Sequence, residues 1–214
     1  MPRKYDVILF DLDGTTADTD SIIIATMNYL YDTYRGGRRT PIEKIYYFSG
    51  PPIKGTLKNE FPDMDNEFMF KAFYEKSKTL YRSHVLPFPH CREVLLQLKK
   101  EGFKLGVVTS KIHELSKITL EVVHLDDLID VLIAFDDVKN PKPDKEGIIK
   151  GIEYFHSTKE RTLYIGDNEI DLLSANNAGI DCALVYWGPR VLSPNLQPKY
   201  KLNSFLELKE KLYD

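Results

Sequence analysis

Two aspartates, one residue apart, follow an apolar run near the start of the chain. Asp11 and Asp13 come directly after residues 7–10, and a run of this kind that ends at a turn is typical of a strand buried on both faces. Side chains two apart on a strand share a face, so the two carboxylates are predicted to project the same way. At about 4 Å they would repel each other by roughly 4 kcal/mol at an effective dielectric constant near 20. A cation, a proton or a substrate charge must therefore belong to this site.

Further polar side chains lie just after later predicted strands or early in the helices that follow. They are Thr109, Ser110, Lys142, Asp167 and Asp171. Ligands of open α/β sheets bind beyond the carboxyl ends of the strands, where the strand order reverses. We therefore expect these side chains to meet Asp11 and Asp13 in one cleft.

The residue types in this cleft suit phosphoryl transfer, which mainly requires positioning and charge neutralisation. The aspartates offer only oxygen ligands, as Mg²⁺ prefers. Thr109 and Ser110 offer hydroxyl and amide groups at the start of a helix for phosphate oxygens, and Lys142 adds a positive charge. Because a carboxylate is a competent nucleophile, Asp11 is expected to attack phosphorus while Asp13 acts as general acid and then general base.

The elements that must position these residues alternate along most of the chain. Strands are predicted at residues 7–10, 103–108, 131–135, 162–165 and 182–186, and helices at 91–101, 112–123, 144–155, 169–177 and 205–212. Such alternation implies a parallel sheet with helices on both faces. We predict an α/β fold with a doubly wound, parallel, five-stranded, Rossmann-like core sheet.

The segment between the first strand and its first packing helix has a helical pattern throughout. Helices are predicted at residues 18–34, 41–48, 53–61 and 65–84, with no strand between them. The expected organisation is a catalytic α/β core domain of residues 1–15 and 87–214 and an inserted all-helical cap domain of residues 16–86.

Composition excludes several classes of function. The 214 residues carry a formal net charge of −3, which gives no electrostatic reason to expect nucleic-acid binding. No apolar run approaches the ~20 residues needed to span a bilayer. Cys91 and Cys182 are read as free thiols, which favours a cytoplasmic location. The expected partner is a small phosphorylated metabolite, with no nucleic acid or membrane, and the chain is expected to be a monomer or homodimer.

The four motifs resemble, in order and spacing, those of the haloacid dehalogenase superfamily, specifically its phosphatases with a helical C1-type cap after the first strand. The matching segments are residues 11–15, 107–111, 140–144 and 166–171. The resemblance implies Asp11 as nucleophile and magnesium ligand and Asp13 as acid and base with its backbone carbonyl on the metal. It further implies Asp167 as a metal ligand and Asp171 as a ligand or outer-shell partner, and it favours Thr109 over Ser110 for phosphate.

Within the superfamily, Asp13 argues against dehalogenases and P-type ATPases, which lack an aspartate there. The chain most closely resembles phosphoglycolate phosphatases and a related inorganic pyrophosphatase of the same subgroup. The resemblance to the phosphoglycolate phosphatases implies magnesium-dependent hydrolysis of a small phosphomonoester through an aspartyl-phosphate. The alternatives are an inorganic pyrophosphatase, a phosphosugar mutase resembling beta-phosphoglucomutase, a phosphonoacetaldehyde hydrolase and a non-catalytic phosphometabolite sensor. Lys54, just after the turn of residues 49–52, is the cap residue predicted to face the leaving group.

Overall fold

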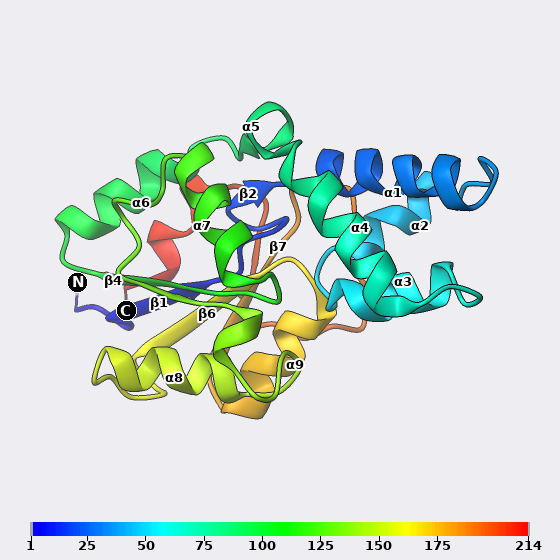
Figure 1. The fold of residues 1–214 in the computed structure, drawn as a ribbon. Coiled ribbons are helices and arrows are strands. Elements are labelled where there is room, and N and C mark those ends of the chain that lie inside the picture. The colour runs from blue at the N-terminus through cyan, green and yellow to red at the C-terminus, as the bar shows by residue number, and fades with distance from the viewer. Residues whose placement is uncertain (1, 214) are drawn as a thin grey trace.

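A parallel sheet forms the centre of the computed structural model, which describes residues 2–213 (Figure 1). Within these residues the sheet has six strands, and their spatial order is β5-β4-β1-β6-β7-β8. They are β1 (Val7–Phe10), β4 (Lys104–Val108), β5 (Val131–Ile133), β6 (Thr162–Gly166), β7 (Asp181–Val185) and β8 (Tyr200–Leu202). The chain runs from β1 to β4 and β5 on one side and then to β6 and β7 on the other. The strand order therefore reverses at β1, the strand that ends at Asp11.

The predicted α/β fold with a parallel sheet is confirmed, but the sheet is wider than the expected five strands. β8 pairs in parallel with β7, with Tyr200 beside Ala183 and Leu202 beside Val185. Of the three residues of β8, Leu202 alone is buried. A three-residue edge strand with one buried side chain has no recognisable period-2 pattern, which explains why it was not predicted.

Helices cover both faces of the sheet (Figure 1). They are α6 (Cys91–Lys100) and α7 (His113–Val122) on one face and α8 (Glu146–Tyr154) and α9 (Glu169–Ala178) on the other. The side chains of β1 alternate between the two apolar cores, since Ile8 and Phe10 belong to one cluster and Val7 and Leu9 to the other. Each fully buried side chain of this size contributes roughly 1.5–3 kcal/mol. The strand that carries Asp11 is thus fixed from both sides.

A group of helices lies beyond the carboxyl ends of the strands (Figure 1). It comprises α1 (Asp20–Tyr34), α2 (Ile42–Ile45), α3 (Ile53–Glu60), α4 (Asn66–Lys78) and α5 (Tyr81–His84). Helices α1 to α4 share an apolar cluster of their own, which includes Met27, Leu57 and Phe73. At the base of the group, β2 (Ala17–Asp18) and β3 (Leu86–Pro87) form an antiparallel ribbon. These features support the proposed cap of residues 16–86, whose boundaries stay a prediction.

Three predicted helices differ from the structure, and the first of them, expected at residues 41–48, is α2 followed by a 3₁₀ turn at Tyr46–Phe48. The helix expected at residues 65–84 is interrupted between Lys78 and Tyr81, where the hydroxyl of Thr79 donates to the carbonyl of Lys76 at 2.7 Å. Hydroxyls that bond to nearby backbone compete with the helical pattern. The helix expected at 205–212 is instead two 3₁₀ turns, Phe205–Glu207 and Lys209–Lys211. None of the helices in residues 2–213 combines the length and apolar character needed to cross a membrane.

Candidate active site

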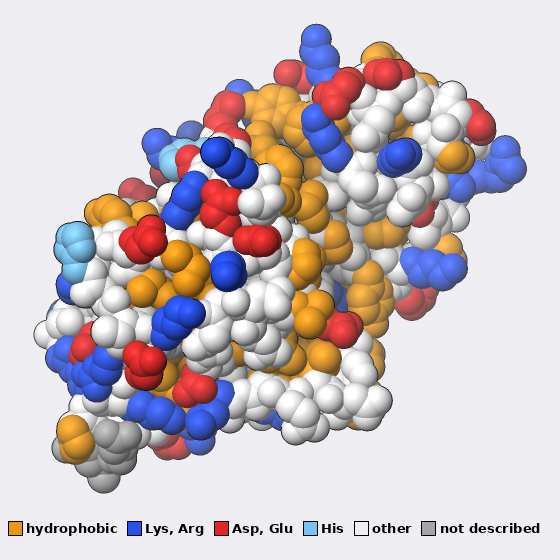
Figure 2. All heavy atoms as spheres, turned by 90° about the horizontal axis from the view of Figure 1, so that it is seen from below, with side chains coloured by type: hydrophobic (Ala, Val, Ile, Leu, Met, Phe, Trp, Pro, Cys, Tyr) orange, Lys and Arg blue, Asp and Glu red, His pale blue; other side chains and the backbone are white. Residues whose placement is uncertain are grey.

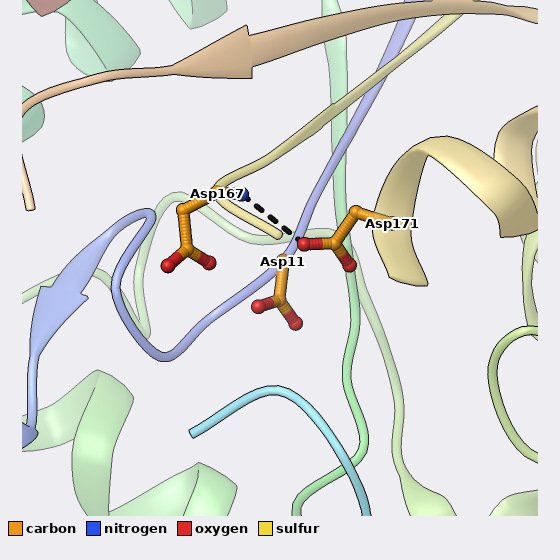
Figure 3. Close-up of side chains that lie close together, drawn as sticks. All are labelled: Asp11, Asp167 and Asp171. Atoms are coloured by element: carbon orange, nitrogen blue, oxygen red, sulfur yellow. Dashed lines mark hydrogen bonds between the residues drawn. The ribbon is translucent and has the colours of Figure 1, made fainter. Parts of the chain in front are cut away.

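Three predicted carboxylates meet at the carboxyl ends of β1 and β6 (Figure 3). Asp11 follows β1, Asp167 follows β6, and Asp171 lies in the first turn of α9. One carboxylate oxygen from each residue lies within 4.8 Å of the others, and all three side chains are buried. The structure therefore brings together residues that are far apart in the sequence, as the strand-end rule predicts.

Asp171 is held in place by the backbone that precedes its helix. Its Oδ2 accepts hydrogen bonds from the amides of Asp167 at 3.1 Å and Asn168 at 3.0 Å. A Cβ atom at Gly166 would lie 2.4 Å from the Asp171 carboxylate, so this position has no room for a side chain. The close approach fixes the distance between the end of β6 and the start of α9.

Lys142 connects two carboxylates of the cluster. Its ammonium donates to Oδ1 of Asp11 and Oδ1 of Asp171, both at 2.7 Å, and to the hydroxyl of Tyr164 at 3.0 Å. Tyr164, which sequence reasoning missed, donates in turn to the carbonyl of Val108 at 2.9 Å. Burial lowers the pKa of Lys142, but the two carboxylates outweigh this effect and hold the pKa well above its ordinary value. Lys142 is therefore a charged group whose three donors all have protein partners.

Arg190 is a second cation of the site, and the sequence analysis did not identify it. Its Nε donates to Oδ2 of Asp167 at 2.7 Å, and its Nη1 donates to Asp20 at 3.0 Å and to the carbonyl of Tyr46 at 2.8 Å. A Cβ atom at Gly14 would lie 1.9 Å from Arg190 Nη2, so only glycine fits beside this pair. Arg190 lies in the loop after β7, and the strand-end rule applied to that loop would have found it.

Asp13 lies outside the carboxylate cluster, and its side chain has separate partners. Its Oδ1 accepts hydrogen bonds from Nζ of Lys111 at 2.5 Å and from the hydroxyl of Thr19 at 2.6 Å. Lys111 is also missing from the predicted site, and its ammonium lies 5.0 Å from the ring centre of Tyr81. Asp13 thus faces the same cavity as Asp11 with a cation of its own.

The two hydroxyl residues after β4 both line this cavity. Thr109 donates its amide to the carbonyl of Ile133 at 3.0 Å, and its Oγ1 accepts from the amide of Lys111 at 3.2 Å. The Thr109 hydroxyl proton remains available as a donor. The Oγ of Ser110 is buried, and no described residue is its hydrogen-bond partner. Both hydroxyls can therefore donate to an anion in the cavity.

The charged groups at the strand ends do not balance one another. The set contains five carboxylates against three cations, namely Asp11, Asp13, Asp20, Asp167 and Asp171 against Lys111, Lys142 and Arg190. Burial raises the pKa of Asp11 to about 8, with neighbouring carboxylates adding to the effect and Lys142 opposing it. Burial likewise raises the pKa of Asp167 to about 7, although the positive charge of Arg190 lowers it. A divalent cation would match the excess of two carboxylates, and the oxygen-only donor set fits Mg²⁺.

The cavity between the sheet and the helical group has two unlike walls. We call the core residues Asp11, Asp13, Thr109, Ser110 and Lys111 the floor, and the helical-group residues Phe48, Pro51, Pro52, Ile53, Phe70 and Phe73 the roof. The enclosed space is about 100 Å³. Lys54 also lines the cavity, but its ammonium bonds Glu67 at 2.7 and 2.9 Å. The structure thus places Lys54 at the cavity and pairs it with a carboxylate of the same helical group.

Comparison with known proteins agrees with this site. The sequence profile of the haloacid dehalogenase-like hydrolase family matches residues 8–185, and the chain belongs to this family. Pyrophosphatase PpaX of Halalkalibacterium halodurans is 34% identical over 96% of this chain and 95% of its own length. A haloacid dehalogenase-like family hydrolase from Streptococcus pneumoniae has a TM-score of 0.84 at 21% identity, covering 97% of this chain and 98% of that chain. A predicted phosphatase from Clostridium acetobutylicum has a TM-score of 0.81 at 25% identity, covering 97% of each chain. The resemblance found in the motifs is confirmed.

Proposed function

We propose that this chain is a phosphatase that hydrolyses a small phosphomonoester, with Asp11 as the nucleophile. The observation that carries the proposal is the position of Asp11, which directly follows a fully buried strand, lines the cavity and belongs to the carboxylate cluster. Lys142 donates a hydrogen bond to Oδ1 of Asp11, whereas Oδ2 of Asp11 accepts no hydrogen bond from the described residues. One oxygen therefore fixes the carboxylate and the other is free to attack phosphorus.

In this proposal Asp13 transfers the protons. It lies two residues after Asp11, faces the same cavity, and is oriented by the hydrogen bonds from Lys111 and Thr19. A carboxyl group held beside the scissile bond can protonate the leaving alkoxide and then deprotonate the attacking water. The release of the alcohol and the hydrolysis of the phosphorylated Asp11 would thus use the same residue in its two protonation states.

The phosphoryl oxygens would be bound from the floor of the cavity. The hydroxyls of Thr109 and Ser110 are the available donors there, and Lys142 offsets the charge of Asp11 from behind. Asp11, Asp167 and Asp171, with the backbone carbonyl of Asp13, are the proposed ligands of Mg²⁺. When bound, Mg²⁺ would neutralise charge on the phosphoryl group and keep the carboxylates ionised.

The test is phosphate release from a generic aryl phosphate by the purified protein with Mg²⁺. Asp11→Asn keeps the shape of the side chain but removes the nucleophile, so we expect kcat to fall by at least about 10³-fold. Asp32→Asn, on the exposed face of α1, is the matched control and should keep full activity. Full activity of Asp11→Asn, with an unchanged unfolding transition, would show that the nucleophile is another residue.

Inorganic pyrophosphate is a second candidate substrate. It is supported by the 34% identity to the pyrophosphatase PpaX of Halalkalibacterium halodurans over 96% of this chain. Comparing the kcat/KM for pyrophosphate, phosphoglycolate and neutral phosphomonoesters separates the two. Conversion of a sugar 1-phosphate to a 6-phosphate without phosphate release would instead indicate a mutase, and binding without turnover would indicate a sensor.

A further inference from the structure

The lining of the cavity that holds the proposed nucleophile also bears on which leaving group the site accepts. The floor presents carboxylates, hydroxyls and Lys111, whereas the six roof residues are aromatic, proline and isoleucine side chains. The lining also includes apolar side chains of the core and polar side chains of the helical group, namely Ile112, Leu115 and Phe135 and Ser49, Lys54, Tyr74 and Ser77. Hydrophobic side chains also gather along the junction between the two parts of the molecule in Figure 2. A phosphoryl group that reacts at the floor leaves its alcohol against the roof.

Cations that could bind a second anionic group are already paired. Lys111 is half-buried and bonds Asp13, and its ammonium also donates to the hydroxyl of Thr119 at 3.3 Å. Among the cavity-lining residues that the structure describes in the helical group, Lys54 is the one cation. Glu67 binds it with both carboxylate oxygens, and the ring of Phe70 lies 4.7 Å from its ammonium. An unpaired charge that is moved from water into apolar surroundings loses hydration without compensation.

The roof offers a neutral polar contact instead. Ser49, in the turn that enters the roof, is 3% exposed, and its Oγ has no hydrogen-bond partner among the described residues. Its carbonyl accepts from Nδ2 of Asn168 at 3.3 Å, which ties this turn to the end of β6. A buried hydroxyl without a partner is a suitable contact for a neutral polar group of a ligand.

We infer, resting on the proposed phosphatase function, that the preferred leaving group is an uncharged and largely apolar alcohol, and that Glu67 enforces this preference by neutralising Lys54. Pyrophosphate and phosphoglycolate would each bring a second anion to the roof. Such an anion must compete with Glu67 for Lys54 or remain unpaired. Glu67 is therefore a specificity residue that acts through Lys54 and does not contact the reacting atoms.

Two esters that differ by one carboxylate test the preference directly. Phenyl phosphate and 3-carboxyphenyl phosphate share an aromatic alcohol, and neither has the magnesium chelation that complicates pyrophosphate. With Mg²⁺ present, we expect kcat/KM for phenyl phosphate to exceed that for the carboxylated ester by at least about tenfold, since the added charge has no free partner. Equal or faster turnover of the carboxylated ester would overturn the inference.

The role of Glu67 is tested by freeing Lys54. Glu67→Gln keeps the side-chain size and removes the charge. The ratio of kcat/KM for phenyl phosphate to that for the carboxylated ester should therefore fall by about two- to fivefold, as expected for an exposed ion pair. The double variant Lys54→Met with Glu67→Gln should restore the original ratio, because no cation is then released. Glu75→Gln, an exposed position on the same helix α4, is the control and should leave the ratio unchanged.

The outcomes separate the two proposals. If the protein releases phosphate from neither ester, the proposed function is refuted, and the inference with it. Release with the opposite preference would refute the inference alone. An unchanged ratio in Glu67→Gln would show that Glu67 does not set the preference.

Discussion

The floor and the roof of the cavity are built in opposite ways. Every ionised side chain described at the floor has a partner of opposite charge, and several of these pairs connect residues from different strands. The six roof residues are apolar and come from loops and helices of the helical group, which side-chain bonds such as that from Asn168 to Ser49 join to the core. In the proposed function, the floor determines which reaction occurs and the roof determines which substrate is accepted.

This division has a physical basis in the two kinds of scaffold. Strand ends in the centre of a sheet are fixed by ladder hydrogen bonds and by packing on both faces, so the geometry needed for phosphoryl transfer is maintained. A roof made of packed apolar side chains can change one residue at a time without disturbing that geometry. The similarity to relatives named as pyrophosphatases is therefore compatible with the apolar leaving group that we propose for this chain.

Arg190 joins the carboxylate cluster to the helical group, and its removal is expected to have the largest effect. Arg190→Met leaves Asp167 buried without its cation and also breaks the bonds to Asp20 and Tyr46 of the helical group. Breaking a buried pair costs about 3–5 kcal/mol, so the free energy of unfolding should fall by that amount in denaturant titrations. Arg92→Met, which removes an exposed pair with Asp127, is the control and should change it little. A loss no larger than in the control would mean that Arg190 does not join the regions.

Gly14 tests how closely the residues around the pair of Arg190 and Asp167 are packed. In Gly14→Ala the new Cβ would lie 1.9 Å from Arg190 and 2.3 Å from Asp167, at a φ of +81°. Backbone strain and overpacking together should cost about 2–4 kcal/mol. Gly36→Ala has a similar φ of +57° with nothing within 4 Å of the new Cβ, so it carries the backbone cost alone, about 1 kcal/mol. Equal losses in thermal or chemical unfolding would contradict the close packing.

Magnesium should act on the carboxylate cluster and not on the roof. If Asp11, Asp167 and Asp171 bind Mg²⁺ in the folded state only, a concentration ten times the Kd raises the free energy of unfolding by about 1.4 kcal/mol. Thermal unfolding with and without Mg²⁺ measures this without any substrate. Asp167→Asn should reduce the stabilisation by Mg²⁺, and Glu67→Gln should leave it unchanged. A shift of the same size in both variants would place the metal elsewhere.

The sequence predicted the carboxylate cluster better than the cations that pair with the carboxylates of the site. Asp11, Asp167 and Asp171 follow strands with clear apolar patterns, so the rule that ligands bind at strand ends brought them together correctly. Lys111 was missed because its pairing with Asp13 depends on how the loop after β4 folds back, which no periodic pattern encodes. Arg190 was missed because the strand-end rule was not applied to the loop after β7. Lys54 was expected to face the leaving group, and its pairing with Glu67 depends on the packing of α3 against α4.

The smallest expected effect concerns the unpartnered hydroxyl of the roof. Ser49→Ala removes a buried Oγ that has no partner among residues 2–213, so it should leave the free energy of unfolding unchanged or raise it by up to about 1 kcal/mol. Ser116 is the matched contrast, because its buried hydroxyl donates to the carbonyl of Ile112 at 2.9 Å and its loss should cost about 1 kcal/mol. Opposite signs in denaturant titrations would identify Ser49 as a polar group kept at a cost to stability, as expected for a residue that binds substrate. Equal destabilisation by both variants would mean that Ser49 has a structural partner and would remove it from the proposed contact with the leaving group.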